Sequence, residues 1–432
     1  MSGRGSGSAE VTVTGFGVRT AFGSGADAVR RGVFAGVPAF APTTRFDTGP
    51  YRTPMAAAAP DGPDAVEDWA LRHALAECGT QALDMAGLRP GTRAAVLLGV
   101  AGDHTSVTRY WRGGGEGETG TDTGTGTGAG GVAERATEAD RAAEADRAAM
   151  SERAAMSERA ADAVPARLTE LLAARLGLTG SRLTFTNACV ASAAAIIHGC
   201  RLISSGRTDV AVCGGGYLVE EETFGKFDSG RALSRDGMVR PFSADRSGLL
   251  LGDGVAVVVL ESAEHTRRRG ARPLASVVGW GAATDAHHIA QPHPEGAGLA
   301  RAARQAMRLA GDPDGAALGY VNAHGTGTKY NDGAETRGLR AAFPDRAESI
   351  PVSSTKSTTG HLLEAAGVVE FVITLLALTD GVLPPTAGFT APDPECDLDY
   401  VPNRPRQADL RRALTVNAAF GGANTALVLE RP

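Results

Sequence analysis

Hydrophobic and polar positions follow two alternating patterns in the first part of the chain. The segment VTVTGFGV at 11–18 alternates apolar with small residues and predicts a strand, and a helix is expected over 28–35. Residues 64–86 have helical spacing, whereas RAAVLLGV at 93–100 is a continuous apolar run, typical of a strand covered on both faces. Strands that alternate with helices in this way indicate an α/β fold.

The same alternation continues to the end of the chain, interrupted by an irregular, glycine-punctuated stretch at 216–240. A strand, a turn of small residues and a fully apolar helix occur at 184–204 and again at 352–378, which suggests a duplicated unit. We place the two halves at 1–265 and 266–432. The elements expected after residue 166 are a helix at 167–175, a strand at 182–186, a buried helix at 190–204, strands at 209–214, 255–261 and 274–282, a helix at 298–309, a strand at 319–323, a helix at 333–342, a strand at 352–354, a long buried helix at 361–378, and strands at 414–417 and 426–430.

A low-complexity insertion at about 112–163 breaks this pattern. Glycine and threonine dominate 113–131, a composition that cannot bury apolar surface. Hexapeptide duplications follow, EADRAA and then AMSERA, and a six-residue period advances about 240° around a helix, so it lines up no apolar stripe. We expect an exposed or unstructured insertion, with a partner-docking arm as the alternative.

Composition excludes several classes of protein. The chain has 432 residues and a formal net charge of −6, without the basic footprint of a nucleic-acid or membrane-surface protein. No apolar stretch reaches the roughly 20 residues of a membrane span, and the first residues lack the apolar core of a signal peptide. The five cysteines are scattered and form no CxxC pair, which argues against a disulfide framework or a metal site and favours a reducing, cytoplasmic location.

Cys189 is the first candidate for chemistry. In TFTNACVASAAAIIHG it follows a β-branched strand and a tight turn and precedes a buried helix. The amides and the positive dipole end of a helix N-terminus favour a thiolate, and the neighbouring alanines leave room for an acyl group. The alternative interpretation is a small core residue.

Two histidines and a lysine are the next candidates. His324 directly follows a strand in VNAHGTGT, where glycines let a ligand approach, although a turn histidine bonded to backbone fits equally well. Lys356 and His361 bracket the Ser/Thr/Gly turn of SSTKSTTGHLLEAAGVVEF before a long apolar helix. Lys356 is one of three lysines in the chain, and a cation is unfavourable near a helix start, which argues for a specific role rather than a solvated surface residue. Together with Cys189, these residues would make a coherent acyl-transfer site.

The ordered set of motifs resembles the β-ketoacyl-acyl carrier protein synthases of fatty-acid and type II polyketide pathways, condensing enzymes of the thiolase-like superfamily. The resemblance covers nearly the whole chain outside the insertion. It rests on the segments quoted above together with RPFSADRSGLLLGDGVAVVVLE at 240–261 and NAAFGGAN at 417–424. It implies an α/β fold of two duplicated βαβαβαββ halves in a five-layered α/β/α/β/α stack, with Cys189 in the first half and His324 and His361 in the second.

The resemblance also implies a mechanism. Cys189 would accept an acyl chain from the phosphopantetheine arm of an acyl carrier protein, with the oxyanion bound by the backbone N–H groups of Cys189 and Phe420. Neutral His324 and His361 would then assist decarboxylation of malonyl carrier protein, and the carbanion would attack the Cys189 thioester. This chemistry requires no ATP, nicotinamide or metal cofactor.

Supporting residues follow from the same resemblance. Lys356 matches a lysine that orients the site, Glu335 and Glu370 match acidic positions around it, and Phe420 matches an aromatic gate. The chain departs from the family where Val190 replaces Ser or Thr and where NAAFGG replaces SFGFGG, so its gating and chain-length control are open.

Partners and alternatives complete the prediction. Because a carrier protein is acidic, docking on a chain of charge −6 calls for a local basic patch, for which Arg235 and Arg240 are candidates. A homodimer or a heterodimer with a chain-length-factor-like subunit is expected. The alternatives are a non-catalytic chain-length-factor-type partner, which would lack the nucleophile, a thiolase or other acyltransferase on the same fold, and a homologue that forms esters or amides. A thiolase would need a second catalytic cysteine, and Cys396 lies in a Pro/Asp-rich stretch unsuited to that role.

Overall fold

The structure is a computed structural model that describes residues 9–58, 70–104, 147, 150–151 and 160–432. Most of the predicted insertion at 112–163, and the start of the helix predicted at 64–86, lie outside the described residues. In the described part of the chain, no helix is long and apolar enough to cross a membrane.

The first half has the element order βαβαβαββ, because short apolar runs alternate with amphipathic or buried helices. Its elements are β1 (Val11–Thr20), α2 (Leu71–Ala86), β5 (Ala95–Gly99), α5 (Pro165–Arg175), β6 (Arg182–Phe185), α6 (Ala191–Ser204), β7 (Val210–Tyr217) and β8 (Gly254–Ser262).

The second half repeats this order. Its elements are β9 (Ala275–Thr284), α9 (Ala297–Leu309), β10 (Leu318–Asn322), α10 (Lys329–Ala342), β11 (Val352–Ser353), α12 (Ala366–Asp380), β14 (Arg412–Ala418) and β15 (Ala423–Glu430). The short elements are β2 (Gly23–Ser24), α1 (Ala26–Val29), a π-helical turn (Arg30–Phe34), β3 (Ala41–Pro42), β4 (Met55–Ala56), α7 (Glu221–Ser229), α8 (Ala263–Arg268), α11 (Lys356–Thr359), β12 (Val382–Leu383) and β13 (Arg406–Gln407).

The two halves also share one strand order. In the first half the order is β1-β8-β7-β5-β6, and in the second it is β9-β15-β14-β10-β11, so corresponding strands occupy corresponding positions. This agreement supports the duplication expected from the two strand–turn–helix segments.

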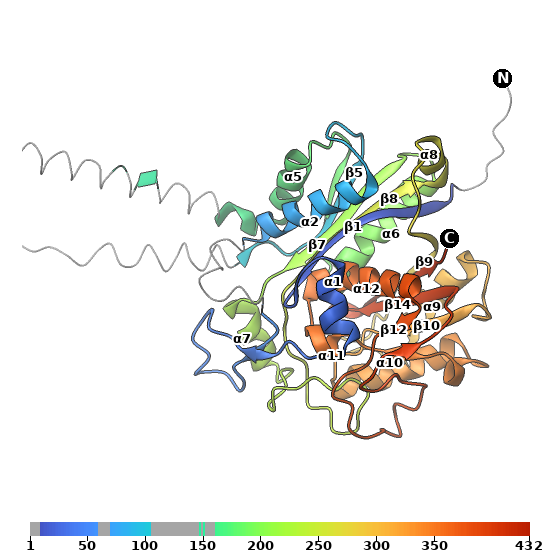
Figure 1. Ribbon diagram of the computed structural model, residues 1–432. Coiled ribbons are helices and arrows are strands. Elements are labelled where there is room, and N and C mark those ends of the chain that lie inside the picture. Colours follow the sequence, from blue (N-terminus) through green and yellow to red (C-terminus); the bar gives the residue numbers. More distant parts are fainter. Residues whose placement is uncertain (1–8, 59–69, 105–146, 148–149, 152–159) are drawn as a thin grey trace, which may run out of the picture.

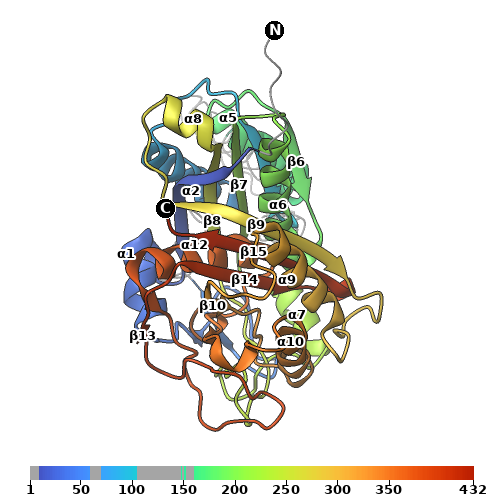
Figure 2. The same cartoon turned by 90° about the vertical axis from the view of Figure 1, so that its right-hand side faces the viewer.

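Five layers result, as expected (Figures 1 and 2). Helices α6 and α12 pack against each other and against the inner faces of both sets of strands, while α2 covers β1 and β8 and α9 covers β9 and β15. Because α12 is enclosed in this way, every residue from Ala366 to Leu378 is buried, which explains its continuous apolar sequence.

The two sets of strands meet at β1. This strand pairs with β8 along its length and, through Val11–Val13, with β9, so that hydrogen bonding runs through a single eleven-stranded sheet.

The structure departs most from the predicted elements at three places. Helix α7 lies within 216–240, which was expected to be irregular, and α10 begins at Lys329 rather than at 333. The long buried helix begins at Ala366 rather than at 361, because α11 and a 3₁₀ turn (Leu363–Ala365) precede it.

Candidate active site

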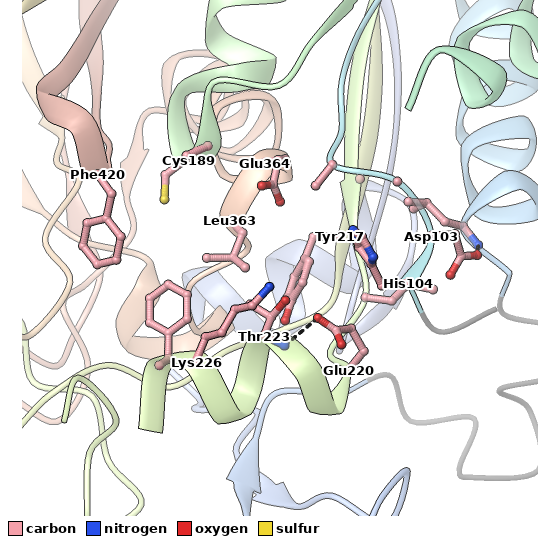
Figure 3. Close-up of a pocket in the computed structure, with 17 residues that line it drawn as sticks. Asp103, His104, Cys189, Tyr217, Glu220, Thr223, Lys226, Leu363, Glu364 and Phe420 are labelled. Atoms are coloured by element: carbon pink, nitrogen blue, oxygen red, sulfur yellow. Dashed lines mark hydrogen bonds between the residues drawn. The ribbon is translucent and has the colours of Figure 1, made fainter. Parts of the chain in front are cut away.

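Cys189 lies in a 3₁₀ turn (Ala188–Val190) between β6 and α6. Ala188 has φ 52°, a left-handed conformation uncommon for a residue with a Cβ, and it begins the tight turn that follows β6, which ends at Phe185. Cys189 is 6% exposed, and its side chain points into the space beside Phe420 and Leu363 (Figure 3).

His361 is held by backbone contacts rather than by a helix. Its N–H donates to the Leu250 carbonyl at 2.7 Å, and its carbonyl accepts from Gly252 N–H at 3.1 Å. The preceding Gly360 has φ 72°, and a Cβ there would approach the carbonyl oxygens of Leu250 and Leu251 at 2.9 Å, so this approach requires glycine.

The structure brings the thiol and both imidazoles together. The distance from Cys189 Sγ to His361 Nε2 is 3.1 Å, and the ring centroids of His324 and His361 are 5.3 Å apart with the planes nearly perpendicular. His324 lies two residues after β10, in the second half of the molecule, and both rings are buried. Three segments far apart in the sequence therefore form one site.

Burial sets the resting protonation of this site. Burial, with a smaller contribution from the Glu364 carboxyl, raises the pKa of Cys189 to about 12, while Lys356 acts in the opposite direction. Burial and the charge of Lys356 both lower the pKa values of His324 and His361 well below the usual range. The resting pair is therefore a neutral thiol beside a neutral imidazole. The desolvation of the Cys189 thiol outweighs the effect of the helix N-terminus, which was expected to favour a thiolate.

Lys356 is buried in an ion pair with Glu370, whose second carboxylate oxygen accepts from Asn417 Nδ2 at 2.6 Å. Both charged side chains are 1% exposed. Burial raises the pKa of Glu370, although Lys356 and Asn417 both act to lower it. This ion pair anchors a positive charge that acts on both histidines.

Glu335, on α10, supports the histidine loop. One carboxylate oxygen accepts from His324 N–H at 2.7 Å and the other from Gly325 N–H at 2.7 Å. Burial raises the pKa of Glu335 to about 7.

A cavity of about 220 Å³ opens beside Cys189 (Figure 3). Phe420 lies at one side, 53% exposed, and its ring stacks on that of Phe227 with centroids 5.7 Å apart. The remaining lining comes from both halves and from α7: Leu71, Ala101, Gly102, Asp103, His104, Ala188, Gly216, Tyr217, Leu218, Glu220, Thr223, Lys226, Leu363 and Glu364.

The two arginines suggested for carrier-protein docking, Arg235 and Arg240, differ in exposure and in ion pairing. Arg235 is exposed, whereas the guanidinium of Arg240 pairs with Asp236 at 2.5 Å and with Asp245 at 3.5 Å. Part of the Arg240 charge is therefore neutralised within the chain.

Sequence reasoning missed several lining residues. Phe227 and Tyr217 were not selected because the stretch after 216 read as irregular, and Glu364 was not selected although it is an acid inside an otherwise apolar run. Asn417 was quoted within a motif, but its contact with Glu370 could not be foreseen.

Comparison with known proteins gives consistent matches. The family model "Beta-ketoacyl synthase, N-terminal domain" matches residues 8–266, and "Beta-ketoacyl synthase, C-terminal domain" matches 274–390. The chain is 34% identical to the tetracenomycin polyketide synthase ketoacyl synthase alpha subunit of Streptomyces glaucescens, over 98% of this chain and 97% of that protein. It is 38% identical to 3-oxoacyl-[acyl-carrier-protein] synthase 2 of Vibrio harveyi, over 62% of this chain and 67% of that protein. Among solved structures, the ishigamide ketosynthase/chain length factor superposes with a TM-score of 0.82 at 31% identity, covering 98% of this chain and 100% of that one.

Proposed function

The chain belongs to the beta-ketoacyl synthase family, and from that membership we propose that it condenses a Cys189-bound acyl group with malonyl-acyl carrier protein in type II polyketide or fatty-acid chain elongation. The observation that carries this proposal is the contact between Cys189 Sγ and His361 Nε2, with the His324 ring beside them. A nucleophile, a proton acceptor and a second hydrogen-bonding ring within one buried site are what the two half-reactions require.

In the first half-reaction, the Cys189 thiol attacks the thioester carbonyl of an acyl carrier protein. His361 Nε2 accepts the thiol proton across the 3.1 Å contact as the sulfur–carbon bond forms. The backbone N–H groups of Cys189 and Phe420 stabilise the oxyanion. Collapse of the intermediate expels the phosphopantetheine thiolate, which takes the proton from His361, so that an acyl-Cys189 thioester and a free carrier thiol result.

In the second half-reaction, malonyl-acyl carrier protein binds and loses carbon dioxide. Negative charge develops on its thioester oxygen, where His324 and His361 donate hydrogen bonds from N–H groups. No described residue hydrogen-bonds to Nδ1 of either ring, and the Cys189 thiol that contacts His361 Nε2 has no proton left to donate once the sulfur is acylated. His361 can therefore accept a proton at Nε2 in one step and present an N–H there in the next.

The enolate carbon then attacks the acyl-Cys189 carbonyl. A carbon–carbon bond forms, the bond to sulfur breaks, and the released thiolate takes up one proton from water to restore the neutral thiol. The products are a 3-ketoacyl-acyl carrier protein, two carbons longer, and carbon dioxide. Loss of carbon dioxide supplies the driving force, and the acyl groups arrive on phosphopantetheine, so the reaction uses no separate cofactor.

Supporting roles follow from the contacts. Burial and the charge of Lys356, which is held by Glu370, keep the histidines neutral, and Glu335 positions the His324 backbone. Phe420, stacked on Phe227 at the cavity, acts as the gate to the acyl group. Arg235 and, more weakly, the ion-paired Arg240 contribute to carrier-protein docking.

We also propose a dimer, with a second copy or with a chain-length-factor-like subunit. Strand β6 ends the sheet, and its residues Arg182 and Leu183 are exposed, which leaves an edge available for pairing. The solved ishigamide relative is itself a ketosynthase/chain length factor. We place the enzyme in the cytoplasm, in keeping with five buried, unpaired cysteines.

The test combines acyl and malonyl carrier proteins with the purified chain, with and without a candidate partner subunit, and weighs the proteins and products by mass spectrometry. The expected result is an acyl adduct on Cys189 and a product two carbons longer. Cys189→Ala removes the adduct, whereas the matched control Cys200→Ala, in a buried cysteine of α6, retains it. An adduct that survives Cys189→Ala, or ester or amide products in place of the elongated chain, would contradict the proposal.

A further inference from the structure

The cavity beside Cys189 is lined by more polar groups than a saturated acyl chain requires. Its apolar walls come from residues such as Leu218, Phe227 and Leu363, and seven polar or charged side chains also line it: Asp103, His104, Tyr217, Glu220, Thr223, Lys226 and Glu364. Its volume of about 220 Å³ lies just below the roughly 300–1,000 Å³ of ordinary small-molecule sites, which suits a short acyl group.

Several of these polar groups already have structural partners. Glu220 caps α7 by accepting from the backbone N–H groups of Glu222 at 2.7 Å and Thr223 at 2.8 Å. Asp103 accepts from Leu71 N–H at 2.9 Å, and Lys226 pairs with Glu222 at 2.6 Å. These groups stabilise the walls of the cavity and do not require a ligand.

Tyr217 is different. It ends β7, is 7% exposed, and its hydroxyl makes no hydrogen bond of acceptable geometry with any described residue, although the Glu220 backbone amide lies nearby. A buried hydroxyl without a partner costs about 1–3 kcal/mol, so such groups are usually satisfied. The unpaired hydroxyl belongs to a residue that lines the same cavity as the nucleophile.

Glu364 offers a second uncommitted group. It lies in the turn before α12, and among the described residues its carboxyl hydrogen-bonds to no other side chain, being approached by its own backbone N–H. The carboxyl lines the same cavity as Cys189 and Tyr217 and acts electrostatically on both. Figure 3 shows Glu364 and Tyr217 among the side chains around the cavity with Cys189.

Building on the proposed ketosynthase function, we propose that Tyr217 and Glu364 select acyl groups that carry a keto or hydroxyl oxygen along the chain over saturated groups of the same length. A keto oxygen accepts from the Tyr217 hydroxyl, and a hydroxyl can accept from Tyr217 while donating to Glu364. A saturated chain fills the same volume but leaves both groups desolvated and unpaired, which weakens its binding.

The raised pKa of Glu364 agrees with this assignment. Burial raises the pKa of its carboxyl, and Glu220 acts in the same direction, while His104 acts to lower it. The protonated acid gains an O–H donor, so the cavity can then offer two donors to a keto oxygen.

The experiment measures the rate of Cys189 acylation by intact-protein mass spectrometry, with carrier-bound eight-carbon chains as probes. The probes are octanoyl, its 3-, 5- and 7-oxo and hydroxy forms, and an 8-amino form. We expect at least one oxygenated chain to react about tenfold faster than octanoyl in kcat/KM, the order of one hydrogen bond. Tyr217→Phe should bring this ratio close to one, and Glu364→Leu should reduce it. Part of each change should be a faster octanoyl reaction, because the polar group that a saturated chain leaves unpaired has been removed.

The controls make the same substitutions outside the cavity. Tyr330→Phe changes a tyrosine that is 71% exposed, and Glu264→Leu changes an exposed acid on α8, and both should keep the wild-type ratio. Equal rates for oxygenated and saturated chains, a ratio unchanged by Tyr217→Phe, or faster reaction of the amine would overturn the inference while leaving the ketosynthase proposal intact. Failure of every chain to label Cys189 would instead refute the proposed function, and the inference with it.

Discussion

The sharpest test of the site concerns Glu335, which binds the His324 loop without contacting Cys189. Each oxygen of its carboxylate accepts one backbone N–H, from His324 and from Gly325, both at 2.7 Å. Glu335→Gln keeps the shape of the side chain but turns one acceptor into an NH₂ donor. One of the two buried backbone N–H groups then faces this NH₂ group and has lost its acceptor.

The size of the effect follows from these two bonds. Loss of one hydrogen-bond acceptor from a buried amide costs about 1–3 kcal/mol, which the loop can relieve by shifting. A displacement of about 1 Å at a positioned catalytic group costs on the order of 10²-fold in rate. We therefore expect malonyl decarboxylation to slow by about 10- to 100-fold in Glu335→Gln. Acylation of Cys189 should stay within about twofold of wild type, because the Cys189–His361 contact does not involve Glu335.

The pH profile separates this role from a merely structural one. Burial raises the pKa of Glu335 to about 7, so the carboxylate that accepts both bonds is the main form above pH 7, and the protonated acid below it. Protonation creates the same defect as the glutamine. Wild-type decarboxylation should fall toward the Glu335→Gln rate as the pH drops below about 7, and the variant should show no such step.

The assay follows carbon dioxide release from malonyl carrier protein and, separately, the mass of acylated enzyme. Glu348→Gln serves as the matched control, since Glu348 is exposed and remote from the histidines. Equal slowing of both half-reactions, or an acid step that persists in Glu335→Gln, would refute the reasoning.

Three further predictions concern the surrounding groups. Lys356→Met leaves the Glu370 carboxylate buried without its counter-ion and should lower the free energy of unfolding by about 3–5 kcal/mol in urea titrations, with at least half regained when Glu370→Leu is added; additive losses would contradict this coupling. Because burial and the Lys356 charge lower the pKa values of His324 and His361, NMR of labelled histidine should find both rings neutral at pH 6, and a midpoint near 6.5 for either would be inconsistent with the site. Arg235→Glu should raise KM for malonyl carrier protein several-fold with little change in kcat, and an unaltered KM would count against docking at this arginine.

Much of the fold could be predicted from local patterns. The order of strands and helices follows from apolar runs and helical spacing, and the repeat of a strand, turn and apolar helix revealed the duplication. Cys189 was placed correctly between β6 and α6, because a strand end, a turn and a helix start are all local signals.

The errors arise where distant segments decide local structure. His361 was assigned to a helix, but hydrogen bonds to Leu250 and Gly252, more than a hundred residues earlier, hold it in extended backbone. Helix α7 was missed because its cap is the side chain of Glu220, a residue type outside the usual N-cap set.

The residues that line the cavity could not be predicted from the sequence either. Tyr217 and Glu364 line one cavity because the end of β7 packs against the turn that precedes α12, in the other half of the chain. The helix-dipole argument for Cys189 failed for a related reason, since the desolvation that opposes it depends on neighbours from the whole fold.

The central position of β1 has a consequence for how this chain is made. Thr12 hydrogen-bonds to the Glu261 carbonyl, 249 residues further on, and Val11–Val13 also needs β9. During synthesis, the apolar strand β1 therefore remains without its partner strands until β8 and β9 have left the ribosome. Such a high contact order favours slow folding and exposes the nascent chain to aggregation, so yields in a foreign host should depend on chaperone supply and translation speed.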